Sequence, residues 1–313
     1  MKIALGPVQY YWSRTAMMQF YELVTDAPVD VVYLGEVICS RRHELRFNDW
    51  LDIADMLANA GKEVVLSTQI LLESGKDMTT LREIAHNGRY TVEANDMGAV
   101  HCVENTPFVA GPWLNVYNPP TLNVLAGLGA RRWVMPLEMG QDGLAHMQAE
   151  RPPELQTEVF AYGRMPLAFS ARCFSARHRN FPKDNCQYVC MDHPDGQVMQ
   201  TQEGKPFLVL NGISTQSALV YNLIQEVDAL RALQVDVLRL SPQSQHTVEI
   251  AGWREPPRRE RAWAPARALA RSGPSRLPRC TLRPPVPPPG DTAGSRRKTC
   301  LGSEKTVRLI GRS

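Results

Sequence analysis

The stretch VDVVYLGEVICSRRHELRFNDWLDIADMLANAGKEVVLST (residues 29–68) contains one complete strand–helix–strand pattern. Residues 29–37 and 62–68 are short runs rich in Val and Leu, as is typical of strands that are covered on both faces of a sheet. Between them, apolar residues of 48–62 recur at helical spacing, and the pattern stops at Gly61, a common helix terminator. This stretch therefore predicts two strands of one sheet that are joined by a helix.

The same alternation extends over residues 1–253. Strands are expected at 2–6, 29–37, 62–68, 90–95, 107–116, 131–139, 157–164 and 233–241, with helical patterns between them, the last over 214–233. Eight strands separated by helices predict a (β/α)8 barrel. A doubly wound open sheet is the main alternative, but no Gly-rich phosphate loop follows the first strand.

A segment of about fifty residues, 164–213, separates the seventh and eighth expected strands. It contains the turn signals HPDGQ (193–197) and QEGKP (202–206), each flanked by short apolar runs. Such a pattern predicts a small β-ribbon that is inserted on top of the barrel.

The composition changes abruptly near residue 253. Residues 254–313 hold 15 Lys and Arg against 4 Asp and Glu and 10 of the 24 prolines, whereas residues 1–253 carry a net charge of −8. This tail has no helical or strand periodicity, so it is either a frameshift product, a natively disordered tail or a basic arm for nucleic acid or anionic lipid. The change falls where the eighth barrel helix should begin, near His246, so a barrel that lacks its last helix is one expectation.

No signal-peptide core and no membrane-spanning run is found in the sequence. We therefore expect a cytoplasmic protein, in which thiols stay reduced and a tight group of cysteines more often binds metal than forms disulfides. The odd number of cysteines, 7, also fits a disulfide framework poorly. Because residues 1–253 are acidic overall, no nucleic-acid partner is expected for this part of the chain.

Three cysteines lie within CFSARHRNFPKDNCQYVC (173–190), and a fourth, Cys39, ends the second expected strand. In a barrel Cys39, Cys173, Cys186 and Cys190 would all rise from the C-terminal face, where barrel enzymes carry their chemistry. Four thiolates can hold either a zinc ion or an iron–sulfur cluster. The spacing, one C-x3-C pair with a lone thiolate from a remote strand, suits a cluster held inside a scaffold better than a self-contained zinc knuckle. His193 is a rival fourth ligand that would favour zinc.

Other residues are weaker candidates. Glu36 and Glu138 could transfer protons, and His43 could face the barrel mouth, although each is equally typical of a solvated loop. Cys102 is expected to be a small buried apolar residue, and Cys280 and Cys300 lie in the tail. The arginines Arg172, Arg177 and Arg179 either attract an anion or only solvate a loop.

The stretch TEVFAYGRMPLAFSARCFSARHRNFPKDNCQYVC (157–190) resembles the signature region of the U32 peptidase-like family. Glu158, Phe160 and Gly163 match its Glu-x-Phe-x-x-Gly core, and the three clustered cysteines match its cysteine block. Cys39 matches the remote ligand of the cluster-binding members. The resemblance covers residues 1 to about 250 and implies a barrel-like fold and a [4Fe–4S] cluster on Cys39, Cys173, Cys186 and Cys190. The tail from residue 254 matches nothing in the family.

Within the family, residues 1–12, 35–50 and 240–247 are most similar to members that act in O2-independent ubiquinone biosynthesis. The resemblance implies a heterodimer with UbiU, hydroxylation of the ring of a prenylated quinone precursor, and prephenate as the oxygen donor. The alternatives are a U32-type enzyme that hydroxylates tRNA and a non-catalytic scaffold that is stabilised by zinc.

An apolar substrate needs an apolar groove, which Trp113, Tyr117, Trp133 and Met135 could line, although they are equally ordinary as core residues. Peptidase activity is not expected, because the sequence contains neither an H-E-x-x-H zinc pair nor a G-x-S-x-G elbow.

Overall fold

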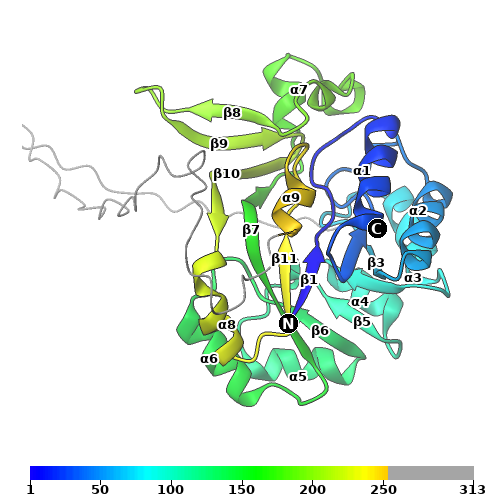
Figure 1. Cartoon of the computed structure of the whole chain (residues 1–313). Helices are drawn as coiled ribbons and strands as arrows, with labels where there is room; N and C mark the ends of the chain where they lie inside the picture. The colour runs from blue at the N-terminus through cyan, green and yellow to red at the C-terminus, as the bar shows by residue number, and fades with distance from the viewer. Residues whose placement is uncertain (253–313) are drawn as a thin grey trace, which may run out of the picture. The chain divides into compact units, whose positions relative to one another are not determined.

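Eight parallel strands close into a barrel in the computed structural model, which describes residues 1–252 (Figure 1). The barrel strands are β1 (Lys2–Leu5), β2 (Val31–Leu34), β3 (Glu63–Ser67), β4 (Thr91–Ala94), β5 (Phe108–Ala110), β6 (Ala130–Val134), β7 (Gln156–Phe169) and β11 (Val237–Leu240). Strand β11 pairs in parallel with both β1 and β7, and these pairings close the barrel. The predicted (β/α)8 barrel is therefore confirmed, and all eight expected strands are present.

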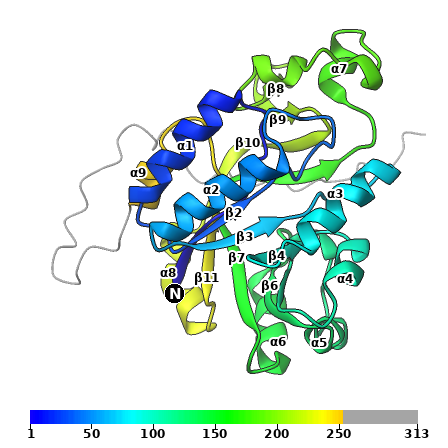
Figure 2. The same cartoon turned by 90° about the vertical axis from the view of Figure 1, so that its right-hand side faces the viewer.

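Helices connect the barrel strands and cover their outer faces (Figures 1 and 2). They are α1 (Arg14–Asp26), α2 (Phe47–Asn59), α3 (Gly75–Ala85), α4 (Met97–Val103), α5 (Pro119–Gly127), α6 (Gln141–Glu150), α8 (Val227–Ala232) and α9 (Thr247–Ala251). The side chain of Ser13 caps α1 by accepting a hydrogen bond from the backbone N–H of Ala16. Strand β5 is shorter than the expected 107–116, because Pro112 has no N–H for the ladder and begins the 3-10 turn η1 (Pro112–Leu114).

The predicted β-ribbon is confirmed above the barrel. The second half of β7 pairs antiparallel with β10 (Ser214–Asn222), which pairs with β9 (Pro206–Asn211), which in turn pairs with β8 (Gln197–Gln200). Between β7 and β8 lie α7 (Phe174–His178) and the 3-10 turns η2 (Lys183–Asn185) and η3 (Val189–Asp192). We call the part from Gly163 to Asn222 the excursion.

The prediction of a helix over 214–233 is wrong for the first half of this segment. Residues 214–222 form β10, and only the 3-10 turn η4 (Ile224–Glu226) and α8 follow before β11. Strand β10 is bonded to β7 on one side and to β9 on the other. These tertiary pairings override a local apolar spacing that fits either a helix or a strand.

The flank beside β1 and β11 is only partly covered in the described residues. Helix α9 spans five residues, and a hollow of about 370 Å³ is lined by side chains that include Ile3, Val227, Leu238, Leu240 and Ile250. The expectation that the eighth helix is incomplete depends on residues beyond 252, which lie outside the described part of the chain. The prediction made for the tail, residues 254–313, lies outside the described residues.

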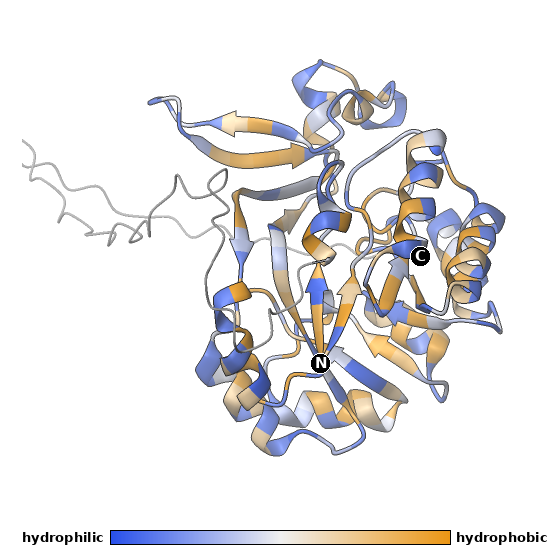
Figure 3. Ribbon diagram, viewed as in Figure 1, coloured by the Kyte–Doolittle hydropathy of each residue, from blue (hydrophilic) through white to orange (hydrophobic). Residues whose placement is uncertain are grey.

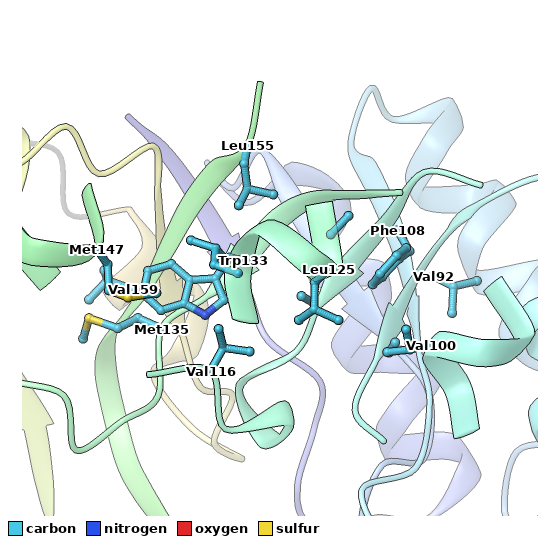
Figure 4. Close-up of a cluster of buried hydrophobic side chains, with 14 of the residues drawn as sticks. Val92, Val100, Phe108, Val116, Leu125, Trp133, Met135, Met147, Leu155 and Val159 are labelled. Atoms are coloured by element: carbon cyan, nitrogen blue, oxygen red, sulfur yellow. The ribbon is translucent and has the colours of Figure 1, made fainter. Parts of the chain in front are cut away.

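Apolar side chains of strands and helices fill the space between the barrel and its helices, and Figure 3 shows apolar residues along both kinds of element. One cluster packs β4–β7 against α4–α6, with Phe108, Leu125, Trp133 and Val159 at its centre (Figure 4). Within residues 1–252, no helix is both long enough and apolar enough to cross a bilayer.

Candidate metal centre

The glutamate of the signature motif lies inside the barrel rather than at its mouth. Glu158 is fully buried, and its carboxylate accepts hydrogen bonds from Arg239 Nε at 2.5 Å and from the Tyr33 hydroxyl at 2.5 Å. Arg239 also lies 2.8 Å from Glu93 Oε1, and Arg132 lies 3.8 Å from Glu158. The two carboxylates and the two guanidinium groups come from four strands and compensate one another's charge. Glu158 therefore stabilises the barrel.

The glycine of the motif permits a close approach of two strands. Gly163 has φ +132°, and a Cβ at this position would lie 2.5 Å from the Cβ of Ser241 at the end of β11. Any side chain here would clash and would strain the backbone. Phe160 stacks on Tyr221 of the excursion, with 6.2 Å between ring centroids. Both residues therefore join the excursion to the barrel.

The four predicted ligands lie in the loop after β2 and in the first part of the excursion. Cys39 and Cys173 both pack against the same small apolar cluster of Val37, Ile38 and Ile213. Cys173 caps α7 and accepts a hydrogen bond from the Ala176 N–H at 3.4 Å. Cys186 ends η2, and Cys190 is buried within η3. The fold thus brings the remote cysteine to the clustered ones.

The thiols are close enough to influence one another's ionisation. Burial raises the pKa of Cys190 to about 11, and the charges of Cys173, Cys39 and Cys186 add to this effect. Burial also raises the pKa of Cys39. Both groups are therefore neutral thiols near pH 7 unless a cation displaces their protons. In the described part of the chain, no three Cys, His, Asp or Glu side chains converge as a ready-made metal site, so the ligand set stays a prediction.

A buried arginine provides positive charge beside these thiols. Arg42 is 5 % exposed, and its guanidinium interacts electrostatically with Cys190 and Cys39. Its Nε has no hydrogen-bond partner among residues 1–252. Burial alone would lower the pKa of Arg42, but Glu36, Cys190 and Cys39 raise it overall, so the residue stays charged. A buried cation with an unused donor suits an anionic group that is held by the thiols.

Asn211 connects this arginine to the cysteine block. Arg42 Nη2 donates to Asn211 Oδ1 at 2.6 Å, and Asn211 Nδ2 donates to the backbone carbonyls of Cys190 at 3.0 Å and His193 at 3.1 Å. Sequence reasoning missed both residues. The position of Arg42 three residues after Cys39 was a usable signal, but nothing near Asn211 in the sequence points to this role.

The remaining candidates have ordinary partners. Glu36 Oε1 accepts hydrogen bonds from the N–H groups of Ile38 and Cys39, and burial raises its pKa. Glu36 therefore shapes the Cys39 loop. Glu138 accepts a hydrogen bond from the Tyr117 hydroxyl at 2.5 Å.

The basic candidates near the cysteines also have ordinary surroundings. His193 contributes its carbonyl to Asn211, and Arg179 lies 3.8 Å from Asp192. His43 is exposed, and desolvation, Lys76 and Arg41 lower its pKa. None of these contacts selects zinc over an iron–sulfur cluster.

Of the four residues predicted to line an apolar groove, only Trp113 lines the cavity at the barrel mouth. Trp133 is fully buried and Met135 is 7 % exposed, both within the core, so the core alternative is correct for them (Figure 4). Trp113 packs edge-on against Phe169 at 4.7 Å between ring centroids, and Tyr117 is exposed on the surface. The cavity at the mouth measures only about 20 Å³, which is too small for an aromatic substrate.

Comparison with known proteins gives one family. Residues 16–253 match the model of Peptidase family U32. Among solved structures, a U32 peptidase is 13 % identical and aligns over 77 % of this chain and 93 % of its own, with a TM-score of 0.42. A type I 3-dehydroquinate dehydratase from Clostridium difficile is 12 % identical over 51 % of this chain and 75 % of its own, with a TM-score of 0.34.

Proposed function

The chain belongs to peptidase family U32, and we propose that it is a UbiV-like subunit of an O2-independent hydroxylase that acts on the ring of prenylated ubiquinone precursors. The proposal takes its substrate from the resemblance of residues 1–12, 35–50 and 240–247 to UbiV. Its proposed partner is UbiU, and prephenate is the proposed oxygen donor. Peptidase activity is not proposed, because the sequence contains neither an H-E-x-x-H zinc pair nor a G-x-S-x-G elbow.

The observation that carries the proposal is the proximity of Cys39 to the cysteine block on the excursion. Cys39, Cys173, Cys186 and Cys190 would hold a [4Fe–4S] cluster, since thiolates are the ligands that such clusters use. When bound, the cluster would supply one-electron chemistry. Arg42 would offset part of the cluster's negative charge. Asn211 would hold Arg42 beside the backbone of Cys190 through its hydrogen bonds to both.

The surface of the excursion supports a protein partner. Large apolar side chains are exposed on its strands, namely Leu167, Val198, Phe207, Leu219 and Val220, of which Leu219 is 63 % and Phe207 58 % exposed. Figure 3 shows this apolar character along β8 and β9, which extend away from the barrel. Apolar side chains exposed along one projecting element are typical of an interaction surface, and we assign this surface to UbiU.

Anaerobic co-expression of the chain with UbiU tests the proposal. We expect the two proteins to co-purify with about four irons per chain. We also expect them to hydroxylate a prenylphenol when prephenate, as the source of the hydroxyl oxygen, and a two-electron acceptor are supplied. Zinc in place of iron, with no hydroxylation, would establish the scaffold alternative. Hydroxylated tRNA in place of hydroxylated prenylphenol would establish the RNA-modifying alternative.

A further inference from the structure

A large opening near the candidate centre lies outside the barrel, between α2 and α3. Helix α1 packs against α2, and α3 packs against α4, whereas α2 and α3 stand apart (Figure 2). A groove of about 470 Å³ lies between them, against the ends of β2 and β3. This volume is within the usual range of small-molecule sites, and it far exceeds the 20 Å³ of the barrel mouth.

The wall of the groove is mainly apolar. Its apolar lining consists of Leu34, Leu45, Phe47, Trp50, Leu66 and Ile84. Leu34 and Leu66 come from β2 and β3, so the bottom of the groove is the outer face of the barrel. A chain of carbon atoms that displaces water from this surface gains hydrophobic stabilisation.

The charged residues of the lining do not favour an anionic ligand. Arg46 and Lys76 line the groove together with Asp77 and Glu83, so charges of both signs are equal in number at its entrance. Deeper in the groove, Arg42 and Glu36 lie 3.5 Å apart. The lining therefore suits a neutral polar group at the end of an apolar ligand.

One buried amide can recognise such a neutral group. Gln69 is 8 % exposed and lines the groove, and its Oε1 is buried without a hydrogen-bond partner among the described residues. Rotation about its terminal bond would present either the NH2 group or the carbonyl to a ligand without the loss of any existing hydrogen bond. A hydroxyl group can pair with both. An unpaired carbonyl oxygen is costly when it is buried, and a ligand hydroxyl that donates to Gln69 Oε1 would relieve that cost.

The deep end of the groove adjoins the Cys39 loop. Glu36, Ser40 and Arg42 line the groove and flank Cys39 in the sequence. The polar end of a ligand at this position would therefore lie beside the candidate metal centre, while its apolar part would run outward between the two helices.

We infer that the α2–α3 groove binds a neutral ligand with a hydroxyl-bearing ring and an apolar tail, of which a prenylated phenol is the representative. The identity of this ligand rests on the proposed function. The location rests on the volume, the apolar lining and the unpaired carbonyl oxygen of Gln69.

Equilibrium dialysis of a geranylated phenol against the anaerobically purified full chain tests the inference. Thr80 lines the groove, whereas its neighbour Thr79 on α3 does not, so Thr80→Trp and Thr79→Trp form a matched pair. We expect Thr80→Trp to weaken binding by at least about tenfold through loss of space and Thr79→Trp to bind as the unaltered protein does. Equal affinities of the two variants would overturn the assignment of the groove.

A second variant tests the recognition of the hydroxyl group. Gln69→Leu should weaken binding of the phenol by about tenfold, the usual effect of one lost hydrogen bond, and leave binding of the same molecule without its hydroxyl group unchanged. An equal effect on both ligands would overturn the role of Gln69.

Iron content and co-purification with UbiU, measured on the same preparations, separate the groove proposal from the proposed function. If iron, pairing and phenol binding persist in both variants, only the groove is wrong; if iron is absent from the unaltered protein, the proposed function fails.

Discussion

Arg42 and Asn211 are separated by 169 positions in the sequence, yet Arg42 Nη2 lies 2.6 Å from Asn211 Oδ1 in a buried hydrogen bond. One residue follows the second barrel strand, and the other ends β9 of the excursion. This bond fixes the loop that carries Cys39 against the segment that carries Cys190. The geometry of the candidate centre therefore depends on a contact that no sequence motif describes.

Asn211→Ala should weaken this connection. The change removes the acceptor of a buried guanidinium and the donor to two carbonyls, so we expect a loss of about 2–3 kcal/mol in the free energy of unfolding and a lower iron content. Urea unfolding and iron analysis measure the two effects. Asn222→Ala is the control, because Asn222 is exposed and accepts only from the Ile224 N–H. Similar iron contents in both variants would contradict the role of Asn211.

Cys39→Ala should reduce the iron content of anaerobically isolated protein as strongly as Cys186→Ala does, because a cubane cluster needs all four thiolates. Cys102→Ala should keep its iron and lose only about 1–2 kcal/mol of stability, since Cys102 packs at the edge of the core. Full iron in Cys39→Ala together with iron loss in His193→Ala would mean that the fourth ligand is His193.

Glu158→Ala should destabilise the barrel strongly. It leaves the buried guanidinium of Arg239 without its 2.5 Å partner, and removal of one member of a buried ion pair costs about 3–5 kcal/mol. Chemical denaturation measures this loss, and Glu154→Ala, at an exposed position of the preceding loop, is the control. If Glu158→Ala keeps its stability but abolishes activity of the assembled enzyme, Glu158 has a chemical role instead.

Phe207→Glu and Leu219→Glu should each weaken the association with UbiU, because a charge in an apolar interface must be desolvated. Analytical ultracentrifugation of the mixed proteins measures the association. Val124→Glu on α5 is the matched control, because Val124 is 63 % exposed, as is Leu219. Unchanged association in both excursion variants would place the partner on another surface.

Deletion of residues 254–313 should change solubility and melting temperature little, because no apolar periodicity in this segment indicates a packed helix. Replacement of the segment by the amphipathic helix from a shifted reading frame should raise both, since such a helix would cover the hollow beside Ile3 and Leu240. Loss of folding or of iron upon deletion would show that the tail is a native part of the protein and would exclude the frameshift.

The periodicity of the sequence was sufficient to predict the barrel. Apolar runs such as residues 29–37, followed by an amphipathic helix and another apolar run, specify strands that are buried on both faces and joined by helices. These signals are local, because side-chain direction repeats every two residues in a strand and every 3.6 in a helix. The positions of Cys39 and Cys173 after barrel strands likewise follow from the order of the elements.

Tertiary structure alone decided the features that depend on distant residues. Residues 214–222 form a strand because β7 and β9 offer pairing partners, and Trp133 is core because α5 and α6 cover it. The bond of Arg42 to Asn211, the pairing of Glu158 with Arg239 and the groove between α2 and α3 also have no local signal. Each of these contacts joins two segments that are distant in the sequence and that closure of the barrel or packing of the excursion brings together. The spacing of residues along one segment carries no information about the residues of the other segment.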